Sequence, residues 1–333
     1  MVTHPMGTAF AQRGSSGWRQ PTATLTGTVS RAGSFARPLA LRPGDAVAVV
    51  APAGPFDRPS FEAGLAVLAS RYRVLYGEGI FARTRYLAGG DGRRLDELAA
   101  ALADDGVRAV FAARGGYGAL RLLSRLAPKL AGLRPRPVIG FSDITALHAA
   151  LQAAGWVSIH GPVVTQLAGQ PLEVAERLFR LLESPGEPAL PLPGIPLVAG
   201  VAEGPLVGGN LSVLTRLLGT PHLPPLDGAV LLLEDVGERP YRVDRMWTHL
   251  TLAGVFERVR GLALGEFTDC EEPGGDHGSA EILAELAAET ELPCVGGLPI
   301  GHGPVNQPVP LGARVRLDAG AGRLEFLEPA VGP

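Results

Sequence analysis

The sequence predicts an α/β fold: an N-terminal, doubly wound and mostly parallel sheet, followed by a C-terminal domain of mixed β and α structure. Two observations support this prediction. From residue 44 onwards, short apolar runs alternate with segments whose apolar residues have helical spacing, which is typical of a parallel sheet covered on both faces. The chain has 333 residues, 46% of them hydrophobic, which is enough for about two domains.

The first domain is expected over residues 42–168. Its strands are short apolar runs that end near Pro or Gly, and its helices carry apolar residues three or four positions apart. The expected strands are 45–51, 73–76, 107–113 and 137–141. The expected helices are 60–70, 93–102, 117–126 and 143–154.

The segment 169–201 is expected to be a linker, because residues 187–196 contain four prolines and show little periodicity. The second domain is expected over 202–330. Its expected strands are 229–233 and 262–267, and its expected helices are 211–218, 241–252 and 279–289. Apolar runs separated by Gly and Pro near the C-terminus predict a partly antiparallel end.

Composition argues against several classes of function. The net charge of −3 gives no basic field to attract nucleic acid or anionic lipid, and no apolar run approaches the roughly 20 residues of a membrane span. Two cysteines, Cys270 and Cys294, cannot build a disulfide framework, which favours a reducing, cytoplasmic location. Residues 1–37 contain four Arg and no Asp or Glu and are expected to be a disordered or non-native extension.

Ser142 lies where a predicted strand runs directly into a predicted helix, in the segment Gly140-Phe141-Ser142-Asp143-Ile144. A nucleophile elbow needs this placement, because the sharp turn exposes the hydroxyl beside the free N–H groups of a helix. The usual G-x-S-x-G pattern has Gly where this chain has Ile144. The alternative is that Ser142 simply caps the helix, with Asp143 in its first turn.

A glycine-rich loop, Arg114-Gly115-Gly116-Tyr117-Gly118, follows another predicted strand. Its backbone N–H groups could approach a ligand at the sheet edge where Ser142 lies, and ligands of open α/β sheets bind at that edge. The loop lacks the Lys-Ser/Thr ending of a phosphate-binding P-loop. A tight turn that needs glycine dihedrals is the alternative interpretation.

An acid and a base complete a candidate catalytic set. Glu234 follows a strongly apolar run, where a buried carboxylate would need a partner, and His302 lies between Gly301 and Gly303. The order Ser142, Glu234, His302 is that of triads built on α/β sheets. In such a triad the imidazole takes the serine proton while the carboxylate holds its other nitrogen.

Metal binding is not favoured by the sequence. An acidic cluster follows Cys270, but it has neither an HExxH pattern nor paired cysteines, and a solvated loop is the preferred interpretation. We expect no metal and no cofactor. The cluster consists of Glu271, Glu272, Asp276 and His277.

Eight short segments, in order, resemble those of the LD-carboxypeptidase family, whose members include bacterial muramoyl-tetrapeptide carboxypeptidases. The resemblance covers about residues 42–328. The segments are RYLAG (85–89), RGGYG (114–118), GFSDIT (140–145), HGPV (160–163), GGNL (208–211), LEDVGE (233–238), FTDC (267–270) and GHG (301–303).

The resemblance implies a role for each matching residue. Ser142 would be the nucleophile, Glu234 the triad acid and His302 the base, with the site between the two domains. The backbone N–H groups of Gly116 and Asp143 would form the oxyanion hole. A homodimer is also implied. The candidate substrate-binding residues are Arg114, Tyr117, His160 and Asn210.

The implied reaction is hydrolysis of the L,D-amide that releases terminal D-alanine from a murein tetrapeptide, a small peptide substrate. A microcin-immunity-type peptidase that cleaves an aminoacyl-nucleotide is the second hypothesis. It would need an aromatic platform for the base, and residues 165–205 contain no aromatic residue apart from Phe179. A non-catalytic anion-binding module is the third hypothesis; its ligand binding would survive removal of the Ser142 hydroxyl.

Overall fold

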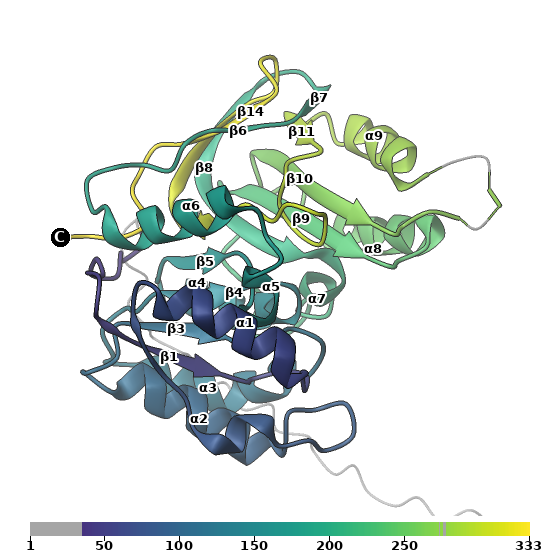
Figure 1. The fold of residues 1–333 in the computed structure, drawn as a ribbon. Helices are drawn as coiled ribbons and strands as arrows, with labels where there is room; N and C mark the ends of the chain where they lie inside the picture. The colour runs from purple at the N-terminus through teal and green to yellow at the C-terminus, as the bar shows by residue number, and fades with distance from the viewer. Residues whose placement is uncertain (1–34, 273, 276–277) are drawn as a thin grey trace, which may run out of the picture. The chain divides into compact units, whose positions relative to one another are not determined.

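The computed structural model describes residues 35–272, 274–275 and 278–333 (Figure 1). Most of the extension expected over 1–37 therefore lies outside the described residues. Its last residues belong to the fold, because the Ala36 N–H donates to the Gly155 carbonyl at 2.6 Å and the Ala36 carbonyl accepts from Val157 at 3.0 Å. Among the described residues, no helix has the length and apolar character needed to cross a bilayer.

The first sheet has six strands in the order β12-β5-β4-β3-β1-β2. Five of them are parallel, and β12, from near the C-terminus, runs antiparallel to β5 with Val309 opposite His160. The strands are β1 (Ala46–Val50), β2 (Arg73–Leu75), β3 (Ala109–Ala112), β4 (Val138–Gly140), β5 (Ser158–His160) and β12 (Val309–Leu311).

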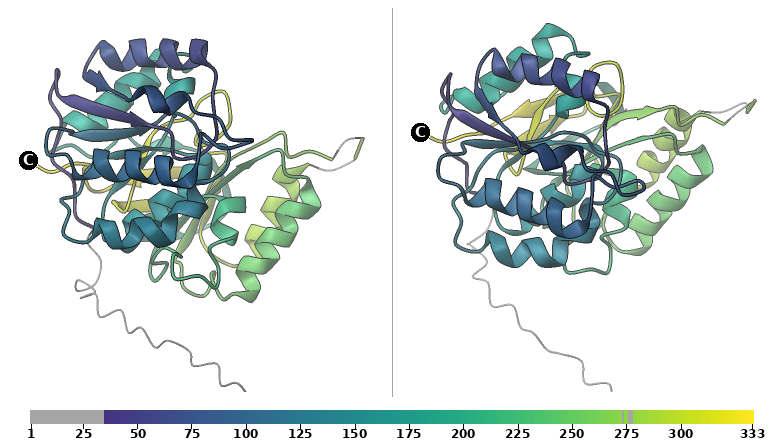
Figure 2. Two further views of the ribbon diagram at one scale, coloured as in Figure 1. Left: turned by 90° about the horizontal axis from the view of Figure 1, so that it is seen from below. Right: turned by 60° about the horizontal axis from the view of Figure 1, so that its bottom comes forward.

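Helices cover both faces of this sheet, as Figures 1 and 2 show. Side chains of β1 alternate between two cores: Val47 and Val49 pack on one face, and Ala48 and Val50 on the other. A parallel strand buried on both faces has this pattern. One face carries α1 (Arg58–Ala69) and α5 (Val164–Leu167), and the other carries α2 (Asp91–Ala103), α3 (Leu123–Leu130) and α4 (Thr145–Ala153).

The second sheet has eight strands in the order β6-β14-β13-β8-β9-β10-β11-β7. The four from β8 to β11 are parallel and the outer pairs are antiparallel, so the sheet is mixed. The predicted fold class is therefore confirmed. The strands are β6 (Leu192–Pro193), β7 (Ile195–Val198), β8 (Val201–Asn210), β9 (Val230–Val236), β10 (Gly261–Thr268), β11 (Cys294–Gly296), β13 (Arg314–Asp318) and β14 (Arg323–Phe326).

Three helices enclose a separate core against β8, β9 and β10. In β9, Leu231 and Leu233 point into this core, and Leu232 points to the opposite face. The helices are α7 (Leu211–Thr215), α8 (Pro240–Leu252) and α9 (Ser279–Glu289).

The segment 169–201, expected as an irregular linker, contains regular structure instead. Helix α6 (Leu172–Glu183) buries Leu178 and Leu182, whose helical spacing the proline-rich neighbourhood obscured. Two of the prolines that follow, Pro193 and Pro196, lie in β6 and β7, the two edge strands of the second sheet. Proline is tolerated at a sheet edge because its missing N–H costs no ladder hydrogen bond.

The helix expected over 117–126 begins later than predicted. A 3₁₀ turn, η2 (Ala119–Leu122), precedes α3, because Gly118 adopts φ 132°, which lies outside the helical region. The glycine-rich loop is therefore longer than the sequence pattern indicated. Glu234 also differs from expectation, since it lies within β9 and not beyond its end.

Candidate active site

Ser142 occupies a strained turn between β4 and α4. A short 3₁₀ turn, η3 (Ser142–Ile144), connects the strand to the helix, and Ser142 has φ 61°. A side chain in this left-handed region costs of order 1–3 kcal/mol and is typical of functional sites, including the nucleophile elbow. The helix-capping alternative is not supported, because Phe141 is the N-cap of η3 and Ile144 that of α4.

Gly140 explains why the elbow tolerates Ile144 where the usual pattern has Gly. A Cβ at Gly140 would lie 3.0 Å from two carbons of the Ile144 side chain and 3.1 Å from the Ala112 Cβ. The strand therefore leaves the space that the isoleucine fills. The glycine that permits close packing at this elbow is therefore Gly140, two residues before Ser142.

The glycine-rich loop lies directly against the elbow. A Cβ at Gly115 would lie 3.0 Å from the Ser142 Cβ and 3.2 Å from its Oγ. Behind the loop, the Gly54 N–H donates to the Gly115 carbonyl at 2.9 Å. The N–H groups of Gly116 and Asp143 donate to no group of the described protein. Both donors are therefore free to bind a ligand near the Ser142 hydroxyl.

Glu234 and His302 form a hydrogen-bonded pair. Nδ1 of His302 lies 2.7 Å from Oε2 of Glu234, a carboxylate that is fully buried in β9. Gly301 permits this approach: it has φ 119°, and a Cβ there would lie 2.6 Å from Glu234 Oε2. A carboxylate can only accept, so Nδ1 donates this hydrogen bond, and in the neutral imidazole Nε2 has a free lone pair. The pair can thus act as an oriented general base.

The His302 ring lies beside the elbow. Its centroid is 4.6 Å from that of Phe141, the residue that precedes Ser142. Within the described part of the chain, no hydrogen bond joins the Ser142 hydroxyl to His302. The structure therefore brings the acid and the base together and places the base next to the elbow.

His160, a candidate substrate-binding residue, is fully buried beside Phe141, with ring centroids 5.7 Å apart. Neither of its ring nitrogens has a hydrogen-bond partner among the described residues. Burial, with His148 and His302 nearby, holds the pKa of His160 well below its usual range. His160 is therefore neutral at pH 7 and contributes no positive charge to the site.

Asn210 caps α7. Its Oδ1 accepts from the Val213 N–H at 3.1 Å, and its Nδ2 donates to Asp235 at 3.0 Å. Burial raises the pKa of Asp235 to about 6, with a smaller contribution from the neighbouring charge of Glu234. These bonds account for the burial of Asn210 without a ligand, so its candidate role in substrate binding gains no support.

The remaining candidate residues lie on the surface. Arg114 is exposed, and its guanidinium donates to the Pro55 carbonyl. Tyr117 is 45% exposed and forms an edge-to-face pair with Tyr86, which is 56% exposed. Tyr86 was not predicted, although it stands in the RYLAG segment that carried the resemblance. Both rings can reach a ligand at this edge of the sheet.

Asn306 is a site residue that the sequence analysis missed. Its buried side-chain oxygen accepts from the Gly301 N–H at 3.0 Å, and its own N–H donates to Gln170 Oε1 at 2.8 Å. These bonds hold the turn that carries His302. The signal was available in the sequence, since Asn in a Gly- and Pro-rich stretch commonly stabilises turns through its side chain.

Within 35–272, 274–275 and 278–333, no group of three or more His, Cys, Asp or Glu side chains is placed to bind a metal ion. Asp276 and His277 of the acidic cluster lie outside the described residues.

The fold is that of a class of peptidases. Within that class, this chain belongs to the LD-carboxypeptidase family: the profile of the family's N-terminal domain matches residues 47–161 and that of its C-terminal domain matches residues 203–317. The resemblance inferred from the eight segments is thus confirmed.

Relatives and solved structures agree with this assignment. The chain is 37% identical over 287 residues to the murein tetrapeptide carboxypeptidase of Pseudomonas aeruginosa, covering 82% of this chain and 92% of that protein. It matches the structure of muramoyltetrapeptide carboxypeptidase from Oxalobacter formigenes with a TM-score of 0.75 and 30% identity, over 84% of this chain and 97% of that one.

A third likeness concerns the fold alone. The structure of the microcin C7 self-immunity protein MccF in complex with aspartyl sulfamoyl adenosine matches with a TM-score of 0.77 at 21% identity. The match covers 89% of this chain and 99% of that protein.

Proposed function

We propose that this protein is a serine LD-carboxypeptidase that removes terminal D-alanine from a murein tetrapeptide. The observation that carries the proposal is the 2.7 Å hydrogen bond between His302 and the buried Glu234, beside the strained turn of Ser142. Family membership and the 37% identity to a murein tetrapeptide carboxypeptidase support the substrate class.

In the proposed acylation, Nε2 of His302 takes the Ser142 hydroxyl proton as Oγ attacks the carbonyl carbon of the L,D-amide. The resulting oxyanion binds the N–H groups of Gly116 and Asp143, which stabilise charge that develops only in the transition state. His302 then donates its proton to the amide nitrogen, and the C–N bond breaks. D-alanine leaves, and the tripeptide remains as an ester on Ser142.

In the proposed deacylation, a water molecule gives a proton to His302 and attacks the ester carbon. The proton then passes to Oγ of Ser142 as the ester bond breaks, so the free tripeptide acid leaves and the enzyme is regenerated. Glu234 keeps its hydrogen bond to Nδ1 of His302 and stabilises the imidazolium. We also propose that Arg114 and Tyr117, on the exposed loop beside Ser142, contact the peptide, with Arg114 pairing a substrate carboxylate.

The direct experiment is mass spectrometry of a murein tetrapeptide after incubation with the protein. We expect a product that has lost one alanine, and no product with Ser142→Ala, whose circular dichroism should match the wild type. A wild-type rate for Ser142→Ala would overturn the proposed nucleophile. Tetrapeptide binding without turnover by the wild type would favour an anion-binding module instead.

A microcin-immunity-type peptidase is the second candidate function. Two observations favour it: the fold similarity to MccF and the exposed aromatic pair Tyr86–Tyr117, which could stack a nucleobase. Parallel assays with the tetrapeptide and with an aminoacyl sulfamoyl adenosine separate the two. We expect a higher kcat/KM for the tetrapeptide, and the reverse order would make the nucleotide the substrate.

The proposal extends to the cellular location and the oligomeric state of the protein. We propose a cytoplasmic homodimer, with no nucleic acid or membrane partner. The oligomeric state can be measured by sedimentation equilibrium, and a monomer at micromolar concentration would contradict the proposed dimer.

A further inference from the structure

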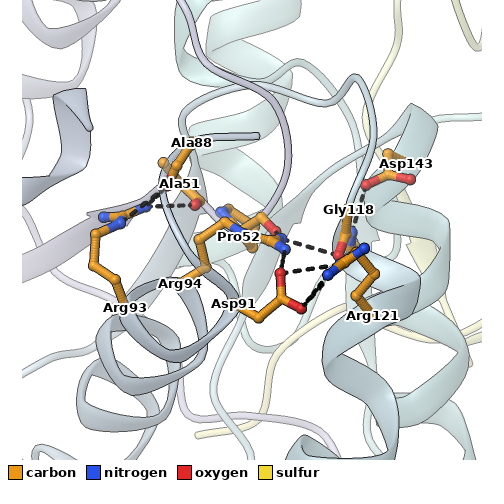
Figure 3. Close-up of polar contacts among 10 residues, drawn as sticks. Ala51, Pro52, Ala88, Asp91, Arg93, Arg94, Gly118, Arg121 and Asp143 are labelled. Carbon is orange, nitrogen blue, oxygen red and sulfur yellow. Dashed lines mark hydrogen bonds and ion pairs between the residues drawn. The ribbon is translucent and has the colours of Figure 1, made fainter. Parts of the chain in front are cut away.

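We propose that the Arg94 side chain and the Asp143 carboxylate are positioning residues for the oxyanion hole. Together they fix the glycine-rich loop of residues 114–118 against the elbow of Ser142. The proposal rests on the proposed function, in which N–H groups of this loop and of the elbow stabilise the oxyanion. Figure 3 shows the polar contacts that carry it.

Arg94 joins three segments of the catalytic edge. It lies on α2 and is fully buried. Its Nη1 donates to the carbonyls of Pro52, in the loop after β1, and of Gly118, at the end of the glycine-rich loop, the latter at 2.9 Å. Its Nη2 donates to Asp91 at 2.6 Å. One planar guanidinium thus sets the distance between two loops and a helix.

Asp143 holds the same loop from the other side. Its side chain is 2% exposed, and Oδ2 accepts from the Ala119 N–H at 2.7 Å. Burial raises the pKa of this carboxyl, and the nearby Arg94 opposes that effect. Asp143 follows Ser142 directly, so this bond ties the elbow to the residue after Gly118. The two oxyanion donors, at Gly116 and Asp143, are therefore linked by a short chain of covalent and hydrogen bonds.

The glycine-rich loop packs tightly against Arg94 at Gly118. A Cβ at Gly118 would lie 2.7 Å from Arg94 Nη1 and 2.7 Å from a methyl carbon of Leu87. Asp91 also pairs with Arg121 of η2 at 2.7 Å, which anchors the turn that follows the loop. A shift of the guanidinium would therefore move the loop.

A purely space-filling role does not account for Arg94. Burying a guanidinium carries a desolvation penalty of several kcal/mol, and well-packed apolar residues are often at least as stabilising. A buried guanidinium is therefore favoured where its directional hydrogen bonds fix the positions of the groups that accept them. Here two of the acceptors are carbonyls of loops at the edge that carries Ser142.

The chain offers a matched control in Arg136. This arginine is also buried, at 8% exposure, and it donates to the carbonyls of Leu102 and Val107 and to Asp105. It precedes β4, at the opposite edge of the sheet from Ser142. Removing the Arg136 guanidinium should lower the free energy of unfolding, as removal of Arg94 should, but it should not move the oxyanion hole.

The test compares Arg94→Met with Arg136→Met, using release of D-alanine from the tetrapeptide. We expect Arg94→Met to lower kcat by about 10²-fold, the typical effect of an ångström-scale misplacement, with KM changed less than threefold. Arg136→Met should keep the wild-type kcat. Both should lower the midpoint of thermal unfolding. If Arg94→Met fails to fold, Arg94→Lys replaces it, since lysine keeps the charge but cannot span both carbonyls.

Asp143 provides a second, isosteric comparison. Asp143→Asn keeps an oxygen that can accept from Ala119, and Asp143→Ala does not. We expect Asp143→Asn to retain kcat within about tenfold, and Asp143→Ala to lose about 10²-fold. Affinity for a peptide boronic acid, which mimics the tetrahedral adduct, should fall with kcat, whereas affinity for the tripeptide product should not.

Equal kcat values for Arg94→Met, Asp143→Ala and the wild type would overturn the inference, as would equal losses in Arg94→Met and Arg136→Met. Failure of the proposed function has a different signature, because Ser142→Ala would then cleave the tetrapeptide normally. An inactive Ser142→Ala together with a fully active Arg94→Met would reject the positioning role alone.

Discussion

The two sheets contribute to the site in different ways. In the first sheet, Ser142 and the glycine-rich loop are placed by backbone turns and by buried hydrogen bonds between side chains and the main chain: Arg94 donates to the Gly118 carbonyl, and Asp143 accepts from the Ala119 N–H. In the second, Glu234 and His302 come from a strand and a later loop, and one 2.7 Å side-chain hydrogen bond joins them. The nucleophile region is therefore set by a strained turn and several buried hydrogen bonds, whereas one long-range hydrogen bond joins the acid to the base.

The difference indicates where each region is vulnerable. A loop that several buried bonds hold should keep part of its function when one of those bonds is lost. A pair that depends on one contact should lose its function when either partner is altered. The variants below test this contrast, beginning with the largest expected effect.

Loss of the acid–base pair should have the largest effect. We expect His302→Ala to lower kcat by about 10⁴- to 10⁶-fold and Glu234→Gln by about 10⁴-fold, with the double variant no worse than His302→Ala, because triad members act as a unit. Steady-state release of D-alanine measures all three. Additive losses in the double variant would show that the two side chains act independently.

Gly301→Ala should break the same contact without removing either partner. The new Cβ would lie 2.6 Å from Glu234 Oε2 on a backbone with φ 119°, so His302 must move, and we expect kcat to fall by about 10²-fold. The control is Gly219→Ala, which has φ 74° and no atom within 4 Å of the new Cβ. It should lose stability but keep kcat; equal kcat in the two variants would contradict the prediction.

Acid should weaken the first sheet through His148. Its Nε2 donates to the Gly140 carbonyl and its Nδ1 accepts from Ser158, at 2.8 and 2.9 Å. Burial lowers the pKa of His148 from 6.5 to about 4. The unfolded chain therefore binds a proton before the folded one. The contribution of neutral His148 to the free energy of unfolding is complete above pH 6.5 and is lost by about pH 4. The loss is about 3 kcal/mol.

Urea unfolding between pH 7 and pH 4 measures this effect as the difference between the wild type and His148→Gln. The difference between the two proteins is needed because Asp235, whose pKa is raised to about 6, has the opposite effect: its contribution to the free energy of unfolding increases as the pH falls. His249→Gln, at an exposed position of α8, is the control. A wild-type pH dependence in His148→Gln would exclude His148 as its source.

The smallest expected effect concerns strain at the elbow. Ser142→Ala keeps a side chain at φ 61°, whereas Ser142→Gly relieves the strain, so we expect the glycine variant to be more stable by about 1 kcal/mol. Both should be inactive. Denaturant midpoints compare the two, and equal midpoints would mean that the turn stores no strain.

The sequence alone determined the parallel core and the placement of Ser142 at a strand-to-helix junction, because both follow from local periodicity and turn chemistry. It did not predict helix α6, whose apolar residues stand beside a proline-rich stretch. It also missed Arg94, because a charged side chain gives no local sign that folding will bury it against distant carbonyls, and it missed Asn306, although an Asn in a Gly- and Pro-rich stretch commonly stabilises turns.

Only the tertiary structure decided that Glu234 meets His302, since 68 residues separate them and no local pattern sets the distance between a strand and a remote loop. It also decided that Asn210 caps a helix and that His160 is buried and neutral. These properties depend on what packs around a side chain. Periodicity determines which face of an element is buried, and the neighbours across the interface determine the chemistry of each buried polar group.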